Sequence, residues 1–165
     1  MTALSLRRAT EADIPFIMET ERKPGYDQFI GRYGVDEHMA QLSSSSFAYL
    51  IGEDTEGSAL GFVILMDLNR RDGNACVKRI AVASPEKGVG TRLLGGAVDF
   101  AFLETNAHRL WLDVVSGNLR AQAVYRKIGF IREGVLREAA LLPDGSRSDF
   151  FLMSILRPEW AARRG

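Results

Sequence analysis

The chain has 165 residues, 46% of them hydrophobic and 25% charged, and its 21 basic and 21 acidic side chains give a net charge of zero. This composition excludes a disordered or fibrous protein, and the charge balance argues against a general binder of nucleic acids or anionic membranes. Because no apolar run approaches the roughly 20 residues that span a bilayer and no secretory signal opens the sequence, we expect one cytoplasmic domain over residues 1–165.

The N-terminal part of the chain predicts a strand and two helices. Residues 4–8 are typical of a short strand. Thr10 can cap the helix that follows while Asp13 returns the hydrogen bond, which predicts a helix through about Glu21. After an irregular stretch at a Pro-Gly pair, residues 35–42 predict a second short helix.

The middle of the chain predicts three strands. Residues 47–52 and 59–67 predict two strands around a turn-rich segment. An Asp-Gly turn at residues 72–73 then leads into a strand over residues 75–82.

A glycine-rich turn follows this last strand and opens a helix, because apolar residues recur at helical spacing over residues 89–101. Gly88 and Gly90 would let a ligand oxygen approach the unpaired N–H groups of a helix start. Lys87 and Arg92 add positive charge that suits a pyrophosphate. A plain tight turn is the alternative that this segment alone leaves open.

Two other phosphate-binding loops do not fit this turn. Leu93 stands where a dinucleotide-binding fingerprint needs its third glycine. The sequence Gly90-Thr91-Arg92 does not match the Gly-Lys-Ser/Thr of a P-loop. A nucleotide-phosphate enzyme of either type is therefore disfavoured.

The last third of the chain predicts a strand, a helix and a β-hairpin. Residues 109–115 predict the strand, and Asn118 can cap a helix that Gly129 closes. Residues 130–142 and 147–156 predict two strands joined by a Pro-Asp-Gly turn. The order of these elements predicts a mixed α/β domain.

Cysteine and histidine are too few for a disulfide or a metal site. Cys76 is the one cysteine, and the two histidines, His38 and His108, lie far apart in the sequence. We expect Cys76 to be a small core residue, with no internal disulfide and no bound metal.

Two blocks of sequence together resemble the GCN5-related N-acetyltransferase (GNAT) superfamily. The first comprises residues 79–82 (RIAV) and 88–94 (GVGTRLL), which resemble the cofactor motif of that family. The second is the pattern N-x-x-A-x-x-x-Y-x-x-x-G-F at residues 118–130. Residues 129–137 look like the branch that contains the ribosomal-protein N-terminal acetyltransferases, and the resemblance spans roughly residues 4–160.

The resemblance implies a mixed, mostly antiparallel sheet of about seven strands with flanking helices, in which strands four and five splay apart. Acetyl-CoA, the acetyl donor, would lie between these two strands. The implied cofactor-binding residues are Ile80, Ala81, Val82, Lys87, Gly88, Val89, Gly90, Thr91, Arg92, Asn118 and Ala121. Arg120, Arg126 and Lys127 could assist the phosphates, although solvated helix faces explain them equally well.

The resemblance also implies that Tyr125 lies near the thioester sulfur, where a phenol can donate a proton to the departing thiolate. Packing of Tyr125 in the core is the alternative. No base is evident, because residues 77–79 (VKR) stand where relatives often place a glutamate. Asp67, Asp113 and Glu21 could act through water, or each could be a structural or solvated acid.

Acidic and aromatic residues gather in the region where such proteins bind the acceptor. The acidic ones are Glu19, Glu21, Asp27, Asp36 and Glu37. The aromatic ones are Tyr26, Phe29 and Tyr33. They would attract a cationic amine and line its pocket, or they form a solvated surface and a local core.

We therefore expect an N-acetyltransferase that moves an acetyl group from acetyl-CoA to a primary amine, either a small metabolite or a protein or peptide N-terminus. The alternative is a non-catalytic acyl-CoA-binding regulatory domain. A homodimer through the last hairpin or an exposed strand edge is compatible with the sequence, whereas nucleic-acid and membrane partners are not expected.

Overall fold

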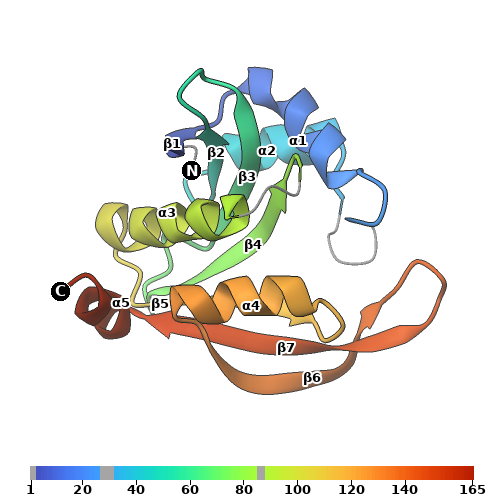
Figure 1. The fold of residues 1–165 in the computed structure, drawn as a ribbon, viewed down its shortest axis with the longest axis vertical. Helices are drawn as coiled ribbons and strands as arrows, with labels where there is room; N and C mark the ends of the chain where they lie inside the picture. The colour runs from blue at the N-terminus through green and yellow to red at the C-terminus, as the bar shows by residue number, and fades with distance from the viewer. Residues whose placement is uncertain (1–2, 27–31, 85–87) are drawn as a thin grey trace.

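A seven-stranded sheet forms the centre of the protein (Figure 1), whose computed structural model describes residues 3–26, 32–84 and 88–165. The strands are β1 (Ser5–Arg8), β2 (Ala48–Glu53), β3 (Ala59–Met66), β4 (Asn74–Val82), β5 (Arg109–Val115), β6 (Ile131–Leu141) and β7 (Arg147–Leu156). Their order across the sheet is β1-β2-β3-β4-β5-β7-β6, and every neighbouring pair is antiparallel except β4 and β5. The expected mixed, mostly antiparallel sheet is confirmed.

Helices cover both faces of this sheet. They are η1 (Glu11–Asp13), α1 (Ile14–Glu21), α2 (Val35–Leu42), α3 (Val89–Glu104), α4 (Leu119–Ile128) and α5 (Arg157–Arg163). One core cluster joins residues of α3 and α4 to the sheet, and a second joins Ile17 of α1 to residues of β2, β3 and β4. None of the helices in the described part of the chain combines the length and apolar character needed to cross a membrane.

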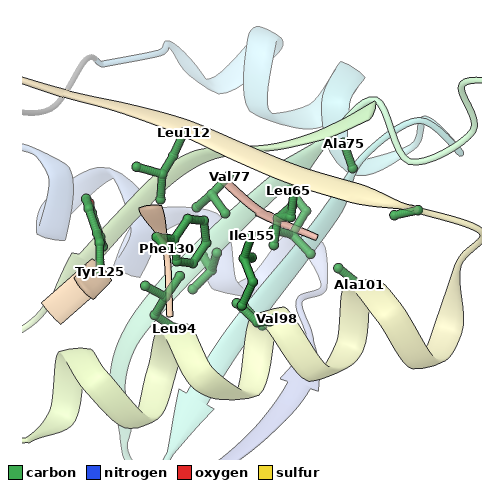
Figure 2. Packing of buried hydrophobic residues seen from close by; sticks show 14 of the residues in the cluster. Leu65, Ala75, Val77, Leu94, Val98, Ala101, Leu112, Tyr125, Phe130 and Ile155 are labelled. Carbon is green, nitrogen blue, oxygen red and sulfur yellow. The ribbon is translucent and has the colours of Figure 1, made fainter. Parts of the chain in front are cut away.

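The apolar stripe predicted for α3 is the face that packs on the sheet. Figure 2 shows Leu94, Val98 and Ala101 pointing from the helix toward Val77 and Ile155 of the strands. Leu94 and Ala101 are fully buried, and Val98 is almost so. Burial of such side chains contributes about 1.5–3 kcal/mol each for the larger ones, so this face fixes α3 against the sheet.

Two of the predicted capping contacts form, those of Asp13 and Asn118, whereas the hydroxyl of Thr10 donates to Asp13 and accepts no backbone N–H from the described residues. The carboxylate of Asp13 accepts the backbone N–H of Thr10 at 2.7 Å. The side-chain oxygen of Asn118 accepts the N–H of Ala121 at 3.2 Å, and Gly129, with φ of 121°, ends α4. Local rules of helix capping therefore suffice to place these helix ends.

The sequence prediction omits the last helix, α5. This seven-residue helix has a proline in its first turn, and the side chain of Glu159 accepts the N–H of Leu156 at 2.9 Å. Trp160 packs on Phe102, with ring centroids 5.2 Å apart, and its indole N–H donates to Asp99 at 2.8 Å. Contacts with α3, rather than a local periodic pattern, therefore hold α5.

Strands β4 and β5 separate after a short stretch of pairing, and this separation determines where a ligand can bind. Residues 74–76 of β4 pair with residues 109–111 of β5, and no further pairs form between these strands. Figure 1 shows the two strands diverging from that end. The predicted splay of strands four and five is confirmed, and it leaves the inner edges of both strands without a neighbour.

Strand β4 also contains a bulge just beyond the last paired residues. Val77 is in register with Leu65 and Arg79 with Ile64, so Lys78 has no partner on β3. A bulge of this kind bends the strand and redirects a side chain. Here it lies where β4 begins to diverge from β5.

Candidate active site

A cavity of about 640 Å³ occupies the gap between the splayed strands. Its wall is built from residues 77–82 of β4, residues 112–114 of β5 and residues of α4 and its cap between Asn118 and Tyr125, together with residues 24–26 after α1. Gly90 of α3 and Phe150 of β7 complete the wall. The cavity thus reaches from the α3 and α4 face of the sheet to the α1 face, and its volume suits a small-molecule site.

The first turn of α3 borders the α3 and α4 side of this cavity. Gly88 is the residue before the helix and has a left-handed conformation, with φ of 87°. A Cβ atom at Gly88 would meet no atom within 4 Å, and at Gly90 the nearest would be 4.0 Å away. Open backbone at a helix N-terminus, where N–H groups lack partners, is a favourable place for a phosphate.

The structure brings most of the predicted cofactor-binding residues to the cavity. Those that line it are Ile80, Ala81, Val82, Gly90, Asn118 and Ala121. Those that lie in or next to the first turn of α3 without lining the cavity are Gly88, Val89, Thr91 and Arg92. Val89 is buried, so only its backbone can face a ligand. Lys87 lies outside the described residues.

The three basic residues of α4 separate into two groups. Arg120 lines the cavity, whereas Arg126 and Lys127 lie in the last turn of the helix and do not. The backbone carbonyl of Lys127 accepts a hydrogen bond from Arg163 of α5 at 2.9 Å. Arg120 is therefore the one of these three that can assist a ligand in the cavity.

Tyr125 combines a buried ring with a hydroxyl that has no hydrogen-bond partner among the described residues. The ring packs in the core against Phe130, with centroids 6.1 Å apart, and Figure 2 shows it at the end of the cluster near Leu112. Within the described residues its hydroxyl makes no hydrogen bond, and the side chain lines the cavity. Burial, reinforced by the negative charge of Asp113, raises the pKa of Tyr125. The phenol therefore keeps its proton at neutral pH.

Asp113 is the one of the three candidate bases that lines the cavity. Its neighbours Leu112 and Val114 point into the core beneath α3 and α4, so the alternation of a strand places Asp113 on the opposite face. Burial raises the pKa of Asp113, and the positive charge of Lys78 opposes this effect. Asp67, in the turn after β3, does not line the cavity.

Glu21 is sealed inside the protein and is therefore not a candidate base or an acceptor-attracting surface acid. Its side chain has no exposed surface, and its Oε1 accepts hydrogen bonds from His38 Nε2 at 2.9 Å and Arg22 Nη1 at 2.8 Å. Oε1 also accepts the backbone N–H of Tyr33 at 3.3 Å. Oε2 accepts from Arg79 Nη1 at 3.1 Å. One carboxylate thus joins α1, α2 and β4.

The partners of Glu21 are themselves linked to further polar and aromatic side chains. His38 Nδ1 lies 2.8 Å from the hydroxyl of Tyr49, which donates to Gln41 at 2.9 Å. The guanidinium of Arg79 lies 4.3 Å from the ring centroid of Tyr33. We call Glu21, His38, Arg79 and Tyr49 the buried polar network. Sequence analysis misses it because its members come from four elements with no shared motif.

The other predicted acceptor-side residues have mixed positions. Tyr26 lines the cavity, and its hydroxyl donates to the carbonyl of Val82 at 2.7 Å. The exposed acids are Glu19, Asp36 and Glu37. Asp27 and Phe29 lie outside the described residues. No group of three or more His, Cys, Asp or Glu side chains that could hold a metal ion occurs in the described part of the chain.

Comparison with known proteins gives consistent matches. The model of the acetyltransferase (GNAT) family matches residues 13–130. Spermidine N(1)-acetyltransferase of Vibrio cholerae is 30% identical over 112 residues, which cover 67% of this chain and 64% of that protein. The enzyme of the same name from Escherichia coli K12 is 29% identical over 130 residues, 77% of this chain and 66% of that protein. The chain thus spans just under two thirds of these curated relatives.

A solved structure extends the similarity to nearly the whole fold. The crystal structure of spermidine N-acetyltransferase from Vibrio cholerae in complex with CoA and spermine has a TM-score of 0.85 and 25% sequence identity. The match covers 96% of this chain and 98% of that chain.

Proposed function

The chain belongs to the acetyltransferase (GNAT) family, and from this membership we propose that it transfers an acetyl group from acetyl-CoA to a primary amine by direct attack of the amine on the thioester. The cavity between β4 and β5 is the observation that carries this proposal, because it opens toward both faces of the sheet. Donor and acceptor can then enter from opposite sides and meet at Tyr125 and Asp113. We propose that residues 1–165 form one such domain.

Acetyl-CoA fits the α3 and α4 side of this cavity. The unpaired edge of residues 80–82 can bond an extended pantetheine arm, and the open backbone at Gly88 and Gly90 can hold the pyrophosphate. The N-terminus of α4 faces the same space, with Asn118 and Arg120 in the wall. Bound there, acetyl-CoA supplies an activated thioester.

Asp113 and Tyr125, on opposite faces of the sheet, each carry out one of the two proton transfers of the reaction. Asp113, directly or through a water molecule, accepts the proton that the amine nitrogen loses as it bonds to the acetyl carbon. Tyr125 donates its proton to the sulfur as the carbon–sulfur bond breaks. The products are an N-acetyl amine and the free thiol, so bonds and protons balance. Positioned acids and bases of this kind contribute roughly 10² to 10⁴ in rate.

Replacing Asp113 by Asn should lower kcat/KM by about tenfold. This loss is smaller than the full rate contribution of a general base, because an α-amine is already partly neutral at pH 7. Because burial raises the pKa of Asp113, the wild-type rate should fall as pH drops through that raised pKa, and this acid limb should vanish in the variant. The measurement is kcat/KM against pH for both proteins. Asp67→Asn, outside the cavity, is the control, and a larger effect there would reject Asp113 as the base.

The acceptor is proposed only as a primary amine. The similar proteins are named for spermidine, a small amine, and a peptide N-terminus is the second candidate because the resemblance of residues 129–137 points to the ribosomal-protein branch. Membership of the ribosomal-protein N-terminal acetyltransferase branch and the formation of a homodimer remain predictions.

Binding of acetyl-CoA can be tested without knowing the acceptor. A ligand at 100 times its Kd adds about 2.7 kcal/mol, which should raise the Tm of a chain of this size by roughly 5–10 °C. The measurement is thermal unfolding with acetyl-CoA, with NAD and ATP as controls. No rise with acetyl-CoA in the folded protein would reject the proposed function. A rise without turnover of any amine would favour the non-catalytic regulatory domain.

A further inference from the structure

Lys78 and Asp113 face the same cavity from opposite strands. Lys78 is the bulge residue of β4 and is exposed, and both side chains line the wall. The two charges attract each other strongly enough to affect the titration of Asp113. No ion pair of 4.0 Å or less joins them within the described residues. Lys78 of β4 and Asp113 of β5 therefore both face the cavity without a direct ion pair between them among the described residues.

The other charged groups of the described wall are both basic. They are Arg79 and Arg120, so the wall contains three cations and one carboxylate. The guanidinium of Arg79 is neutralised by Glu21 at 3.1 Å. Arg120 lies close enough to Tyr26 to influence its hydroxyl electrostatically. Arg120, at the start of α4, belongs to the donor side of the proposed complex, so Lys78 is the wall cation that remains opposite Asp113.

This balance is unfavourable for an acceptor that carries several positive charges. A polyamine has a cationic group at each nitrogen near pH 7, because the pKa of an alkylamine is about 10. Within the described wall, Asp113 could pair with one such group, while another would approach Lys78. Like charges brought together across a cavity disfavour binding and select against the wrong partner.

We propose that the preferred acceptor is a primary amine that also carries a carboxylate, with its amine at Asp113 and its carboxylate at Lys78. This inference rests on the proposed function. Two sources share this chemistry: a free acidic amino acid and a peptide whose N-terminal residues include an acidic side chain. Lys78 is then a specificity-determining residue. The chemical step is unchanged: the amine attacks the thioester of acetyl-CoA.

Pairs of acceptors that differ only in one carboxylate test the effect of that negative charge on the reaction. Alanyl-glutamate amide and alanyl-glutamine amide have the same α-amine and differ in one carboxylate, and free glutamate and glutamine separate the amino-acid source from the peptide source. Release of the CoA thiol gives kcat/KM for each, with spermidine alongside. We expect the carboxylate-bearing member of at least one pair to be preferred over its neutral partner and over spermidine by about tenfold, the size of one charge-assisted hydrogen bond.

Lys78→Glu should abolish or reverse this preference. Arg71→Glu is the matched control, since it makes the same charge change at an exposed turn residue that does not line the cavity. It should leave the preference unchanged. The rise of Tm with acetyl-CoA should persist in both variants, which shows that each is folded and binds the donor.

The outcomes separate this inference from the function on which it rests. A preference for spermidine, or a Lys78→Glu variant that retains the wild-type ratio between matched acceptors, would overturn the inference while acetyl-CoA binding and turnover upheld the function. If acetyl-CoA failed to stabilise the wild-type protein, the proposed function itself would be rejected.

Discussion

Replacing Tyr125 by phenylalanine is expected to lower kcat by about a hundredfold or more while leaving the fold and acetyl-CoA binding nearly unchanged. The substitution removes only the hydroxyl, which makes no hydrogen bond within the described residues, and keeps the ring that packs against Phe130. The lost rate is the contribution of a positioned general acid. Steady-state kinetics with a saturating amine measure kcat, and the Tm shift with acetyl-CoA measures donor binding.

The pKa of Tyr125 makes this prediction more specific. Burial raises it above the ordinary value of 10.0, so the phenol should remain protonated and active across the alkaline range in which the acceptor becomes neutral. Tyr33→Phe is the control, because it removes the same hydroxyl group from a tyrosine that does not line the cavity. An unchanged kcat in Tyr125→Phe, or an equal loss in Tyr33→Phe, would show that Tyr125 is a packing residue.

Local patterns were sufficient to predict the elements that carry the donor side of the site. The periodic apolar residues of α3, the cap at Asn118 and the terminating glycine of α4 each involve a few consecutive residues, and the structure has them as predicted. The splay of β4 and β5 came from the family resemblance instead. No rule of composition or periodicity says where two parallel strands stop pairing.

The acceptor side was less predictable because its arrangement depends on contacts between distant segments. In the sequence, Lys78 is one polar residue within a predicted strand. Only the register of β4 against β3, in which Lys78 has no partner, shows that it lies at a bulge. Glu21 and Arg79 are 58 residues apart and meet in the core. A charged residue in a sequence is usually exposed, which favoured an acidic surface as the place of Glu21. The structure instead confirms the alternative of a structural acid, because Glu21 is buried.

Replacing Glu21 by alanine should destabilise the protein by about 3–5 kcal/mol, the largest stability effect we expect from any one charged residue. The variant would leave Arg79 and His38 buried without their carboxylate, and an uncompensated buried charge is costly. The Tm should fall by roughly 10 °C. Glu19→Ala, an exposed acid on the same helix, is the matched control and should change stability by no more than about 0.5 kcal/mol.

The same substitution should also affect the acceptor, because Glu21 holds both ends of the segment between α1 and α2. Arg22 begins this segment and Tyr33 ends it, and both bond to Glu21 Oε1, while Arg22 Nη2 donates to the carbonyl of Tyr33 at 2.8 Å. Residues 24–26 of this segment form part of the cavity wall. In the milder Glu21→Gln variant, KM for the amine should rise severalfold more than the Kd for acetyl-CoA. Equal changes would limit Glu21 to a structural role.

The pH dependence gives an independent test of the buried polar network. Burial acts to raise the pKa of Glu21, but the hydrogen bond and charge of His38 and the charge of Arg79 outweigh it, so the pKa lies below its ordinary value of 4.5. A lowered carboxyl pKa means stability that is present above about pH 4.5 and is lost as pH falls through the folded-state value. The part of the difference in unfolding free energy between wild type and Glu21→Gln that comes from the Glu21 charge should therefore shrink as pH falls below 4.5. A difference that grew on acidification would mean that Glu21 is protonated in the folded protein and that the network is not held by its charge.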